Sequence, residues 1–256
     1  MATSPLPRIL SPALLSYLQS HPHLPSCSWY FIASVTLSAL NRPDEIPAVF
    51  KYALEKGGQK ASTKPSHDEQ LKIARQIREA LVKTAPIGGL PKAINSLLSL
   101  KSVTPPALQD EPLAYSPTAR PVELYDIPSS TILHRGQNFF DKIYGKVSKR
   151  VMGQMDRSGT EDLGITARLM YGYILSNTSV LTAAESSLVL IAGLIPQDVN
   201  PQLKGHLKGA LNNGAKTSEI QAVREIVIVI CEASGMTQIG ESVPGGWGWR
   251  NEVANL

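Results

Sequence analysis

The sequence predicts an all-α protein. Apolar residues recur at three- and four-residue spacings over 69–83 and 219–233, which is the pattern of a helix with one buried face. Alternating strand patterns bounded by tight turns are nearly absent, and the β-branched run 226–230 keeps the helical period. A further helix is expected over residues 11–20. These observations favour helices packed on helices.

The composition is that of an ordinary globular protein. Of the 256 residues, 43% are apolar and 18% are charged. The net charge of +4 is small and scattered, whereas nucleic-acid-binding proteins concentrate Lys and Arg on one face, so no nucleic-acid partner is expected. No run approaches the roughly 20 apolar residues of a transmembrane helix, so no membrane span is expected. Cys27 and Cys231 do not make a disulfide framework, which favours a reducing compartment.

A proline-rich segment divides the chain. Residues 101–128 contain six prolines, and proline lacks the N–H that a helix interior or a central strand requires. This segment is expected to be an extended connection between a first helical repeat, residues 1–100, and a second repeat, residues 129–240. Residues 241–256 are expected to form a mobile tail.

The two halves resemble each other. The sequence A-L-E-K-G at 53–57 matches A-L-N-N-G at 210–214, and the Arg-Glu pair at 78–79 matches the pair at 224–225. Each half is expected to contain a helix, a short loop, a helix that ends at a glycine, and one more helix. This pattern points to duplication of one helical unit.

The match between the halves breaks at one acid–base residue. His206 in the second half corresponds to Val49 in the first. A site that occurs once per chain is therefore expected in the second half.

The second half carries a specific motif. Residues 203–214 read L-K-G-H-L-K-G-A-L-N-N-G and are followed by E-I at 219–220. This stretch resembles the core of the carboxymuconolactone decarboxylase family, L-x-x-H-x-x-x-A-L-N-N-G and then E-I. Residues 89–95 are similar to the family's G-x-P-x-A-x-N turn into a helix. The resemblance covers most of 29–236, and implies a homo-oligomer with the all-helical fold of alkyl hydroperoxidase D (AhpD), here as a fungal-type member with two repeats.

The family contains two chemistries, and the thiol chemistry is not expected here. The AhpD branch uses a Cys-x-x-Cys pair just before the motif histidine and a Glu nineteen residues before it. Those positions hold Val199, Gln202 and Ser187. Neither Cys27 nor Cys231 stands in place to supply the thiolate that this chemistry requires. Thiol peroxidase activity would need these two cysteines to meet, which their positions in the two halves do not favour.

The decarboxylase branch needs proton transfer rather than thiols. His206 is the obvious acid–base group in the motif, and a pKa near neutrality suits a general acid or base. Lys204 and Lys208 flank it and could attract a carboxylate substrate. The alternative is that His206 bonds a neighbouring helix carbonyl and does no chemistry.

Four further residues are candidates for the site. Glu185 could orient the His206 imidazole as a second catalytic group, or be a first-turn acid favoured by the helix dipole. Arg135 could bind a substrate carboxylate, or pair structurally with an acid such as Asp162. Ser187 and Gln202 occupy the positions of the lost thiol centre and are candidate substrate-binding residues.

The remaining ionisable residues indicate neither a metal nor a cofactor. His21 and His23 lack a third ligand at a useful spacing, so no metal site is expected. A set of cations in the second half is expected to form a solvated face diluted by two acids: Arg135, Lys142, Lys146, Lys149, Arg150 and Arg157, with Asp141 and Asp156.

The C-terminus indicates a location. Ala254-Asn255-Leu256 is similar to the S-K-L peroxisomal address, with an uncharged Asn in the middle position. A peroxisomal import receptor is therefore an expected partner. The cytoplasm and the mitochondrion are the alternatives. The acid-free segment 1–42 favours the mitochondrion, but Arg8 is its sole cation before Arg42, whereas transit peptides are Arg-rich.

Two functions remain open from the sequence. One is a thiol-independent, cofactor-free lyase or isomerase that acts on a small carboxylate or lactone, with His206 as general acid or base. The other is a non-catalytic binding or scaffold protein of the AhpD-like superfamily, since a fold does not fix a function.

Overall fold

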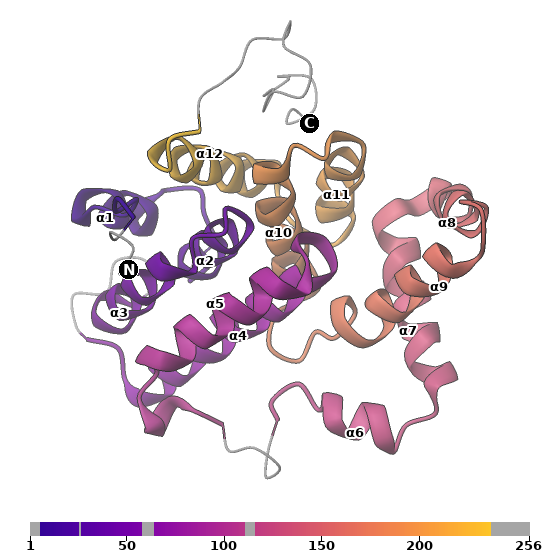
Figure 1. The fold of residues 1–256 in the computed structure, drawn as a ribbon, viewed down its shortest axis with the longest axis horizontal. Helices are drawn as coiled ribbons and strands as arrows, with labels where there is room; N and C mark the ends of the chain where they lie inside the picture. The colour runs from indigo at the N-terminus through magenta and orange to yellow at the C-terminus, as the bar shows by residue number, and fades with distance from the viewer. Residues whose placement is uncertain (1–5, 26, 58–63, 111–115, 237–256) are drawn as a thin grey trace, which may run out of the picture.

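The computed structural model describes residues 6–25, 27–57, 64–110 and 116–236, and every regular element within these ranges is a helix (Figure 1). The prediction of an all-α fold is confirmed. The first half contains α1 (Pro12–Ser20), α2 (Trp29–Ala39), η1 (Pro43–Glu45), α3 (Ile46–Lys56), α4 (His67–Gly88), α5 (Leu90–Val103) and η2 (Pro106–Leu108). The second half contains α6 (Arg120–Tyr125), α7 (Ser129–Tyr144), η3 (Gly145–Val147), α8 (Ser148–Asp156), α9 (Asp162–Leu169), η4 (Met170–Leu175), α10 (Ala183–Leu194), η5 (Ile195–Gln197), α11 (Asn200–Asn212) and α12 (Thr217–Ala233). All η elements are 3-10 turns except η4, which is a π-helix.

Side-chain caps set several helix boundaries. The Ser11 hydroxyl accepts from the backbone N–H of Leu14 and starts α1. Ser66 and Thr182 each form a capping box with the glutamate three residues later, at the starts of α4 and α10. α4 and α12 confirm the two helices predicted from periodicity, and α1 confirms the helix expected over residues 11–20.

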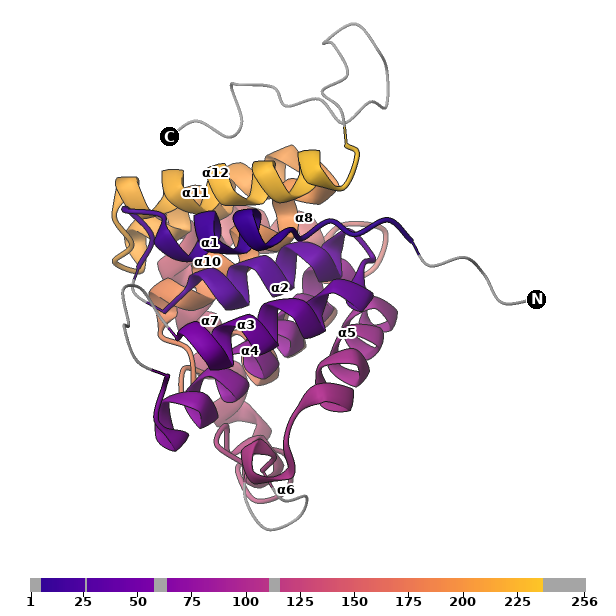
Figure 2. The same cartoon turned by 90° about the vertical axis from the view of Figure 1, so that its left-hand side faces the viewer.

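Two central helices, α2 and α10, pack against each other and form the core. Every residue of α2 is buried, as is the stretch 186–194 of α10. α4 packs against both, and α11 and α12 pack against α10, as Figure 2 shows from the side. Burial of this largely apolar surface is the main force that stabilises the fold.

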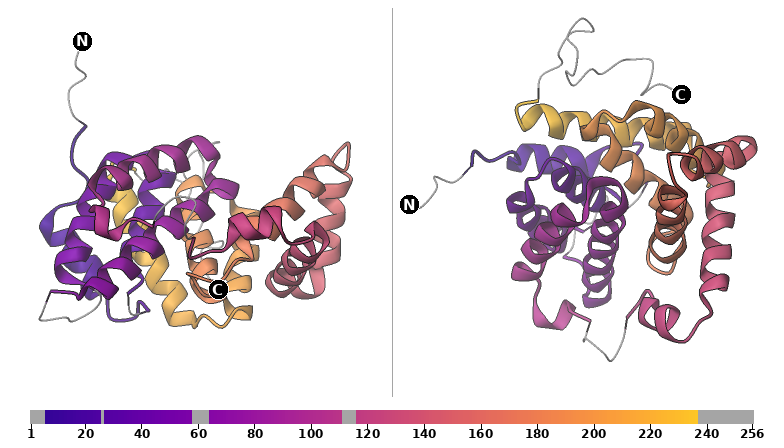
Figure 3. Two further views of the ribbon diagram at one scale, coloured as in Figure 1. Left: turned by 90° about the horizontal axis from the view of Figure 1, so that it is seen from below. Right: turned by 45° about the vertical axis from the view of Figure 1, so that its right-hand side comes forward.

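Helices α7, α8 and α9 form an arm beside this core (Figure 3). Phe139 and Phe140 of α7 and Tyr171 of η4 fill a second, smaller cluster, which Leu190 of α10 joins. α7 and η4 cross closely because both have a glycine at the crossing: a Cβ added at Gly136 would lie 2.5 Å from the backbone nitrogen of Gly172.

The connection between the halves is not simply extended, so the prediction over 101–128 is wrong in part. α5 continues to Val103, and η2 and α6 follow. Proline begins η2 and lies in the first turn of α6. The first N–H groups of a helix have no intrahelical partner, so proline costs nothing there. The predicted tail at 241–256 lies outside the described residues.

The order of elements is the same in the two halves. Helix, 3-10 turn, helix and helix follow one another as α2-η1-α3-α4 and as α10-η5-α11-α12. α3 and α11 are each followed by a glycine with a positive φ, Gly57 (68°) and Gly214 (97°). This order is what a duplication would produce, and the duplication itself stays a prediction.

Candidate functional site

His206 lies where α11 packs against the end of α7. Two glycines of α11 allow the approach: a Cβ at Gly209 would lie 2.6 Å from the Ile143 side chain, and one at Gly205 would lie 3.0 Å from the Tyr144 ring. The Asn212 side-chain amide donates to the Ile143 carbonyl at 3.1 Å. The glycines and the asparagine of the motif therefore fix the position of the helix that carries His206.

The His206 imidazole is buried and only half-satisfied. It is 5% exposed, and its Nε2 lies 3.5 Å from the Tyr144 hydroxyl. Its Nδ1 is buried with no hydrogen-bond partner among the described residues. Burial lowers the pKa of His206 to about 4, so the imidazole is neutral at pH 7. An unpaired buried polar group costs about 1–3 kcal/mol, so Nδ1 is a candidate for contact with a ligand.

Two tyrosines extend this contact into a chain of polar groups. The hydroxyls of Tyr144 and Tyr171 interact with each other, and burial raises the pKa of both. Phe140 packs on both rings, with centroids at 4.5 Å from Tyr144 and 4.9 Å from Tyr171.

The contact with Tyr144 bears on the His206 tautomer. A tyrosine hydroxyl carries one proton, which the Tyr144 hydroxyl is able to donate to Nε2 of His206. Nε2 is then the acceptor, and the imidazole proton sits on Nδ1, the unpartnered nitrogen. Tyr144 is only half-buried, so it connects the buried chain with the surface.

Tyr171 lies in the π-helix η4, and carbonyls of η4 and of the residues after it accept hydrogen bonds from the buried Lys83. The Lys83 ammonium donates to the carbonyls of Ile174, Leu175 and Asn177 at 3.2, 2.8 and 2.8 Å. It also lies 3.5 Å from the Glu79 carboxylate. Burial lowers the pKa of Lys83 to about 8. π-Helices are rare and occur often at functional sites.

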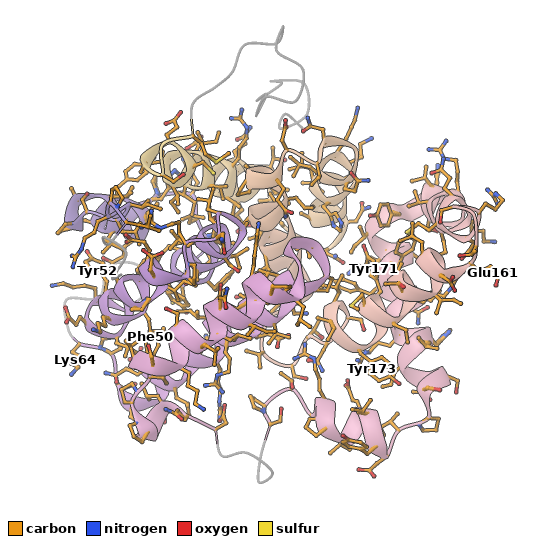
Figure 4. The ribbon with its side chains drawn as sticks, viewed as in Figure 1. Phe50, Tyr52, Lys64, Glu161, Tyr171 and Tyr173 are labelled. Atoms are coloured by element: carbon orange, nitrogen blue, oxygen red, sulfur yellow. The ribbon has the colours of Figure 1, made fainter. Side chains whose placement is uncertain are left out.

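Two arginines also donate hydrogen bonds to backbone carbonyls of η4. Arg120 binds both Glu79 oxygens at 2.7 and 2.6 Å, and donates to the carbonyls of Tyr173 and Ile174. Arg135 donates to the Gly172 carbonyl at 3.0 Å. Figure 4 shows Tyr171 and Tyr173 where the arm meets the core. The Glu79 and Lys83 pair was missed from the sequence, although its four-residue spacing on a predicted helix was a usable signal.

The Arg135 side chain binds other residues of the protein. Its guanidinium forms a bidentate pair with Glu123 and donates to the Ser176 hydroxyl at 3.0 Å. Of the two sequence interpretations, this geometry favours the structural pair, with Glu123 rather than Asp162 as the acid. Asp162 instead accepts from Thr160.

Glu185 and Ser187 form hydrogen bonds with residues other than His206. The Glu185 carboxylate caps α10 through Thr182 and accepts a long bond of 3.5 Å from Gln76. The Ser187 hydroxyl donates to the Ala183 carbonyl and accepts from Asn213 at 3.0 Å.

Gln202 is exposed on α11. The partner that the structure does bring to His206, Tyr144, is separated from it by 62 residues. No local sequence pattern predicts this contact.

The two cysteines are free and sit in different environments. Cys231 is buried on α12, and burial raises the pKa of its thiol to about 12. Cys27 precedes α2, and burial raises its pKa as well. A reactive cysteine has a lowered pKa, so these thiols are poor nucleophiles.

Two surface pockets lie away from His206. One, of about 290 Å³, lies between α4 and α5 and is lined by Arg78, Leu98 and Lys101. The other, of about 770 Å³, lies beside α3 and is lined by Arg8 and Lys51.

None of the helices in the described residues combines the length and the apolarity that crossing a bilayer requires. Across the same residues, no three His, Cys, Asp or Glu side chains gather as a metal ion would need.

Fold and site together define an all-α protein with one buried histidine–tyrosine chain and no activated thiol. No family model matches the sequence. The chain is 40% identical over 212 residues to peroxisomal protein 2 of Schizosaccharomyces pombe, which covers 83% of this chain and 89% of the relative. It is 32% identical over 267 residues to peroxisomal protein 2 of Saccharomyces cerevisiae, covering 88% and 94%. The chain therefore belongs to the peroxisomal protein 2 family.

Its location follows from these relatives. The protein is peroxisomal, as the C-terminus predicted. The tripeptide Ala254-Asn255-Leu256 itself lies outside the described residues.

Proposed function

We propose that this protein is a cofactor-free, thiol-independent lyase or isomerase of the carboxymuconolactone decarboxylase kind, acting on a small carboxylate or lactone. The observation that carries the proposal is the His206 imidazole, which is buried with Nδ1 unpaired and Nε2 against the Tyr144 hydroxyl. The motif at 203–214 supports the same assignment.

The proposed mechanism moves a proton through a neutral imidazole. When a substrate carboxylate leaves as carbon dioxide, its bonding electron pair stays on the substrate as an enolate. Nδ1 of His206 donates its proton to this enolate while Nε2 takes one from Tyr144. Tyr144, which is half-buried, recovers a proton from water, and the hydroxide that is left combines with the released carbon dioxide as bicarbonate. Return of the imidazole proton from Nε2 to Nδ1 then restores the starting tautomer. The pKa of about 4 suits this transfer, because the imidazole never has to become charged. The sequence-based expectation of a His206 pKa near neutrality does not hold in this environment.

The test is turnover by variants against a panel of lactones and hydroperoxides, with carbon dioxide release as one readout. His206→Ala and Tyr144→Phe are each expected to lower kcat/KM for a lactone, His206→Ala by about 100-fold or more. Gln221→Ala, an exposed change on the neighbouring helix α12, is the control and should be unaffected. Turnover by His206→Ala equal to that of the wild type would contradict the mechanism. Activity that survives in Cys27→Ser/Cys231→Ser would support a reaction that does not depend on thiols.

A second candidate function is a binding or scaffold role, and exposed apolar side chains favour it. Leu90, Ile94 and Leu98 lie four residues apart on one face of α5 and are 61%, 46% and 60% exposed. Contiguous exposed apolar surface marks interaction sites. This surface also supports the predicted homo-oligomer. Light scattering of the wild type and Leu98→Asp would test it: a multimer that Leu98→Asp dissociates supports the oligomer, and a monomeric wild type contradicts it.

Import through the C-terminal tripeptide is the proposed route to the peroxisome. Deleting residues 254–256 from a fluorescent fusion should disperse its punctate signal. Unchanged punctate localisation would show that another segment carries the import signal.

A further inference from the structure

The surface around Tyr144 is basic and contains no acid in its own segments. The sequence has no Asp or Glu between residues 142 and 155 or between residues 199 and 218. Seven cations in these segments are exposed. We leave out Lys216, which directly precedes α12, and refer to the other six as the basic rim: Lys142, Lys146, Lys149, Arg150, Lys204 and Lys208. In a chain with a net charge of only +4, this is a concentration of positive charge.

The fold brings the two segments of the basic rim together. α11 lies along the end of α7, as the close approach of Gly209 to Ile143 and the bond from Asn212 to the Ile143 carbonyl require. η3 leads directly from α7 into α8, so the first-turn cations of α8 follow. Figure 1 shows α11, the end of α7 and α8 along the same side of the molecule. The rim therefore combines cations that lie about 60 positions apart in the sequence.

Two acids border the segment that carries Lys142, Lys146, Lys149 and Arg150, and both are hydrogen-bonded. Asp156 is held by Arg168 through bonds of 2.6 and 2.8 Å, which compensates its charge. Asp141 accepts from the uncharged Gln137 amide at 2.9 Å and keeps its negative charge. With one of the two acids compensated, the basic rim keeps a net positive charge.

The residue types in the rim indicate the ligand. Five of the six cations are lysines, and a lysine ammonium is a point charge that suits a tetrahedral phosphate. A planar carboxylate is more often bound by the bidentate fork of an arginine. Several point charges around one half-buried tyrosine match several phosphate charges on one small molecule.

We propose that the basic rim is a binding site for a small organic molecule that carries two or more phosphate groups. The phosphates lie against Lys204, Lys208 and their neighbours, and the uncharged end of the molecule reaches Tyr144. Placing that end for reaction at His206 rests on the proposed function, whereas binding of the phosphates does not. A small ligand is favoured over a nucleic acid or a membrane because the rim borders a single half-buried tyrosine that leads to a buried imidazole.

Calorimetric titration with inorganic pyrophosphate tests the site. The wild type is expected to bind pyrophosphate in low salt, and added salt should weaken binding because the charges are exposed. Lys204→Glu/Lys208→Glu is expected to weaken binding at least tenfold. The matched control is Lys51→Glu/Lys56→Glu, which reverses two exposed lysines on α3, the helix at the same place in the order of the first half. Circular dichroism is used to check that both variants fold.

Several results would overturn the proposal. They are no binding by the wild type, an equal loss in the two double variants, and binding to vesicles of anionic phospholipid without binding to free pyrophosphate. His206→Ala separates this proposal from the proposed function: it should bind pyrophosphate as the wild type does. If it does so while no substrate is turned over by the wild type, the proposed function fails and the phosphate site stands.

Discussion

The two halves of the molecule have the same order of helices, but they hold different residues or environments at the positions that match in sequence. On α3, Val49 is fully buried, and on α11 the matched residue is the half-satisfied His206. On α4, Glu79 is buried between Lys83 and Arg120, whereas on α12 the matched Glu225 is 54% exposed and pairs with His21. One architecture thus carries a buried ion cluster in one half and an acid–base group in the other.

The largest expected effect comes from the matched glutamates. Glu79→Ala would leave the buried Lys83 and the partly buried Arg120 without their carboxylate, and is expected to cost about 3–5 kcal/mol of unfolding free energy. Glu225→Ala removes an exposed partner and should cost about 1 kcal/mol or less. Urea unfolding of both variants measures the difference. Equal losses would mean that the two positions are not distinguished by burial as the structure describes.

The buried His206, which matches Val49 in the first half, predicts that the free energy of unfolding depends on pH. The pKa of His206 is lowered to about 4, so between pH 6.5 and pH 4 the unfolded chain takes up a proton that the folded chain does not. Stability is therefore lost as pH falls through this window, by about 3 kcal/mol in all. His206→Leu should lose this component and keep the rest of the acid profile. Superimposable acid unfolding curves for the variant and the wild type would contradict the buried neutral imidazole.

The sequence predicted the helices better than the site. The spacing of apolar residues, the glycine after α11 and the presence of His206 in one half only are local features, so they can be recognised in the sequence. The contact of His206 with Tyr144 and the hold of Lys83 on η4 depend on how distant helices pack. α6 was missed because prolines were taken to exclude helix, although Pro121 lies in its first turn, where no N–H is needed.

The smallest expected effect concerns Ser187, which the sequence resemblance aligns with the glutamate of the thiol branch. Its hydroxyl bonds Asn213 and the Ala183 carbonyl and takes no part in the histidine–tyrosine chain. Ser187→Ala should cost about 1 kcal/mol and leave the acid profile of His206 intact. A change in that profile, measured by the same unfolding curves, would place Ser187 in the site.

The most direct test of the account is a nitrogen-15 NMR titration of His206 in the intact protein. We predict a neutral imidazole with its proton on Nδ1 and a pKa of about 4. Tyr144→Phe should move the Nε2 signal and leave the Nδ1 signal almost unchanged. A His206 pKa of about 6.5 or higher, the ordinary range of an exposed histidine, would contradict the buried chain on which the proposed chemistry depends.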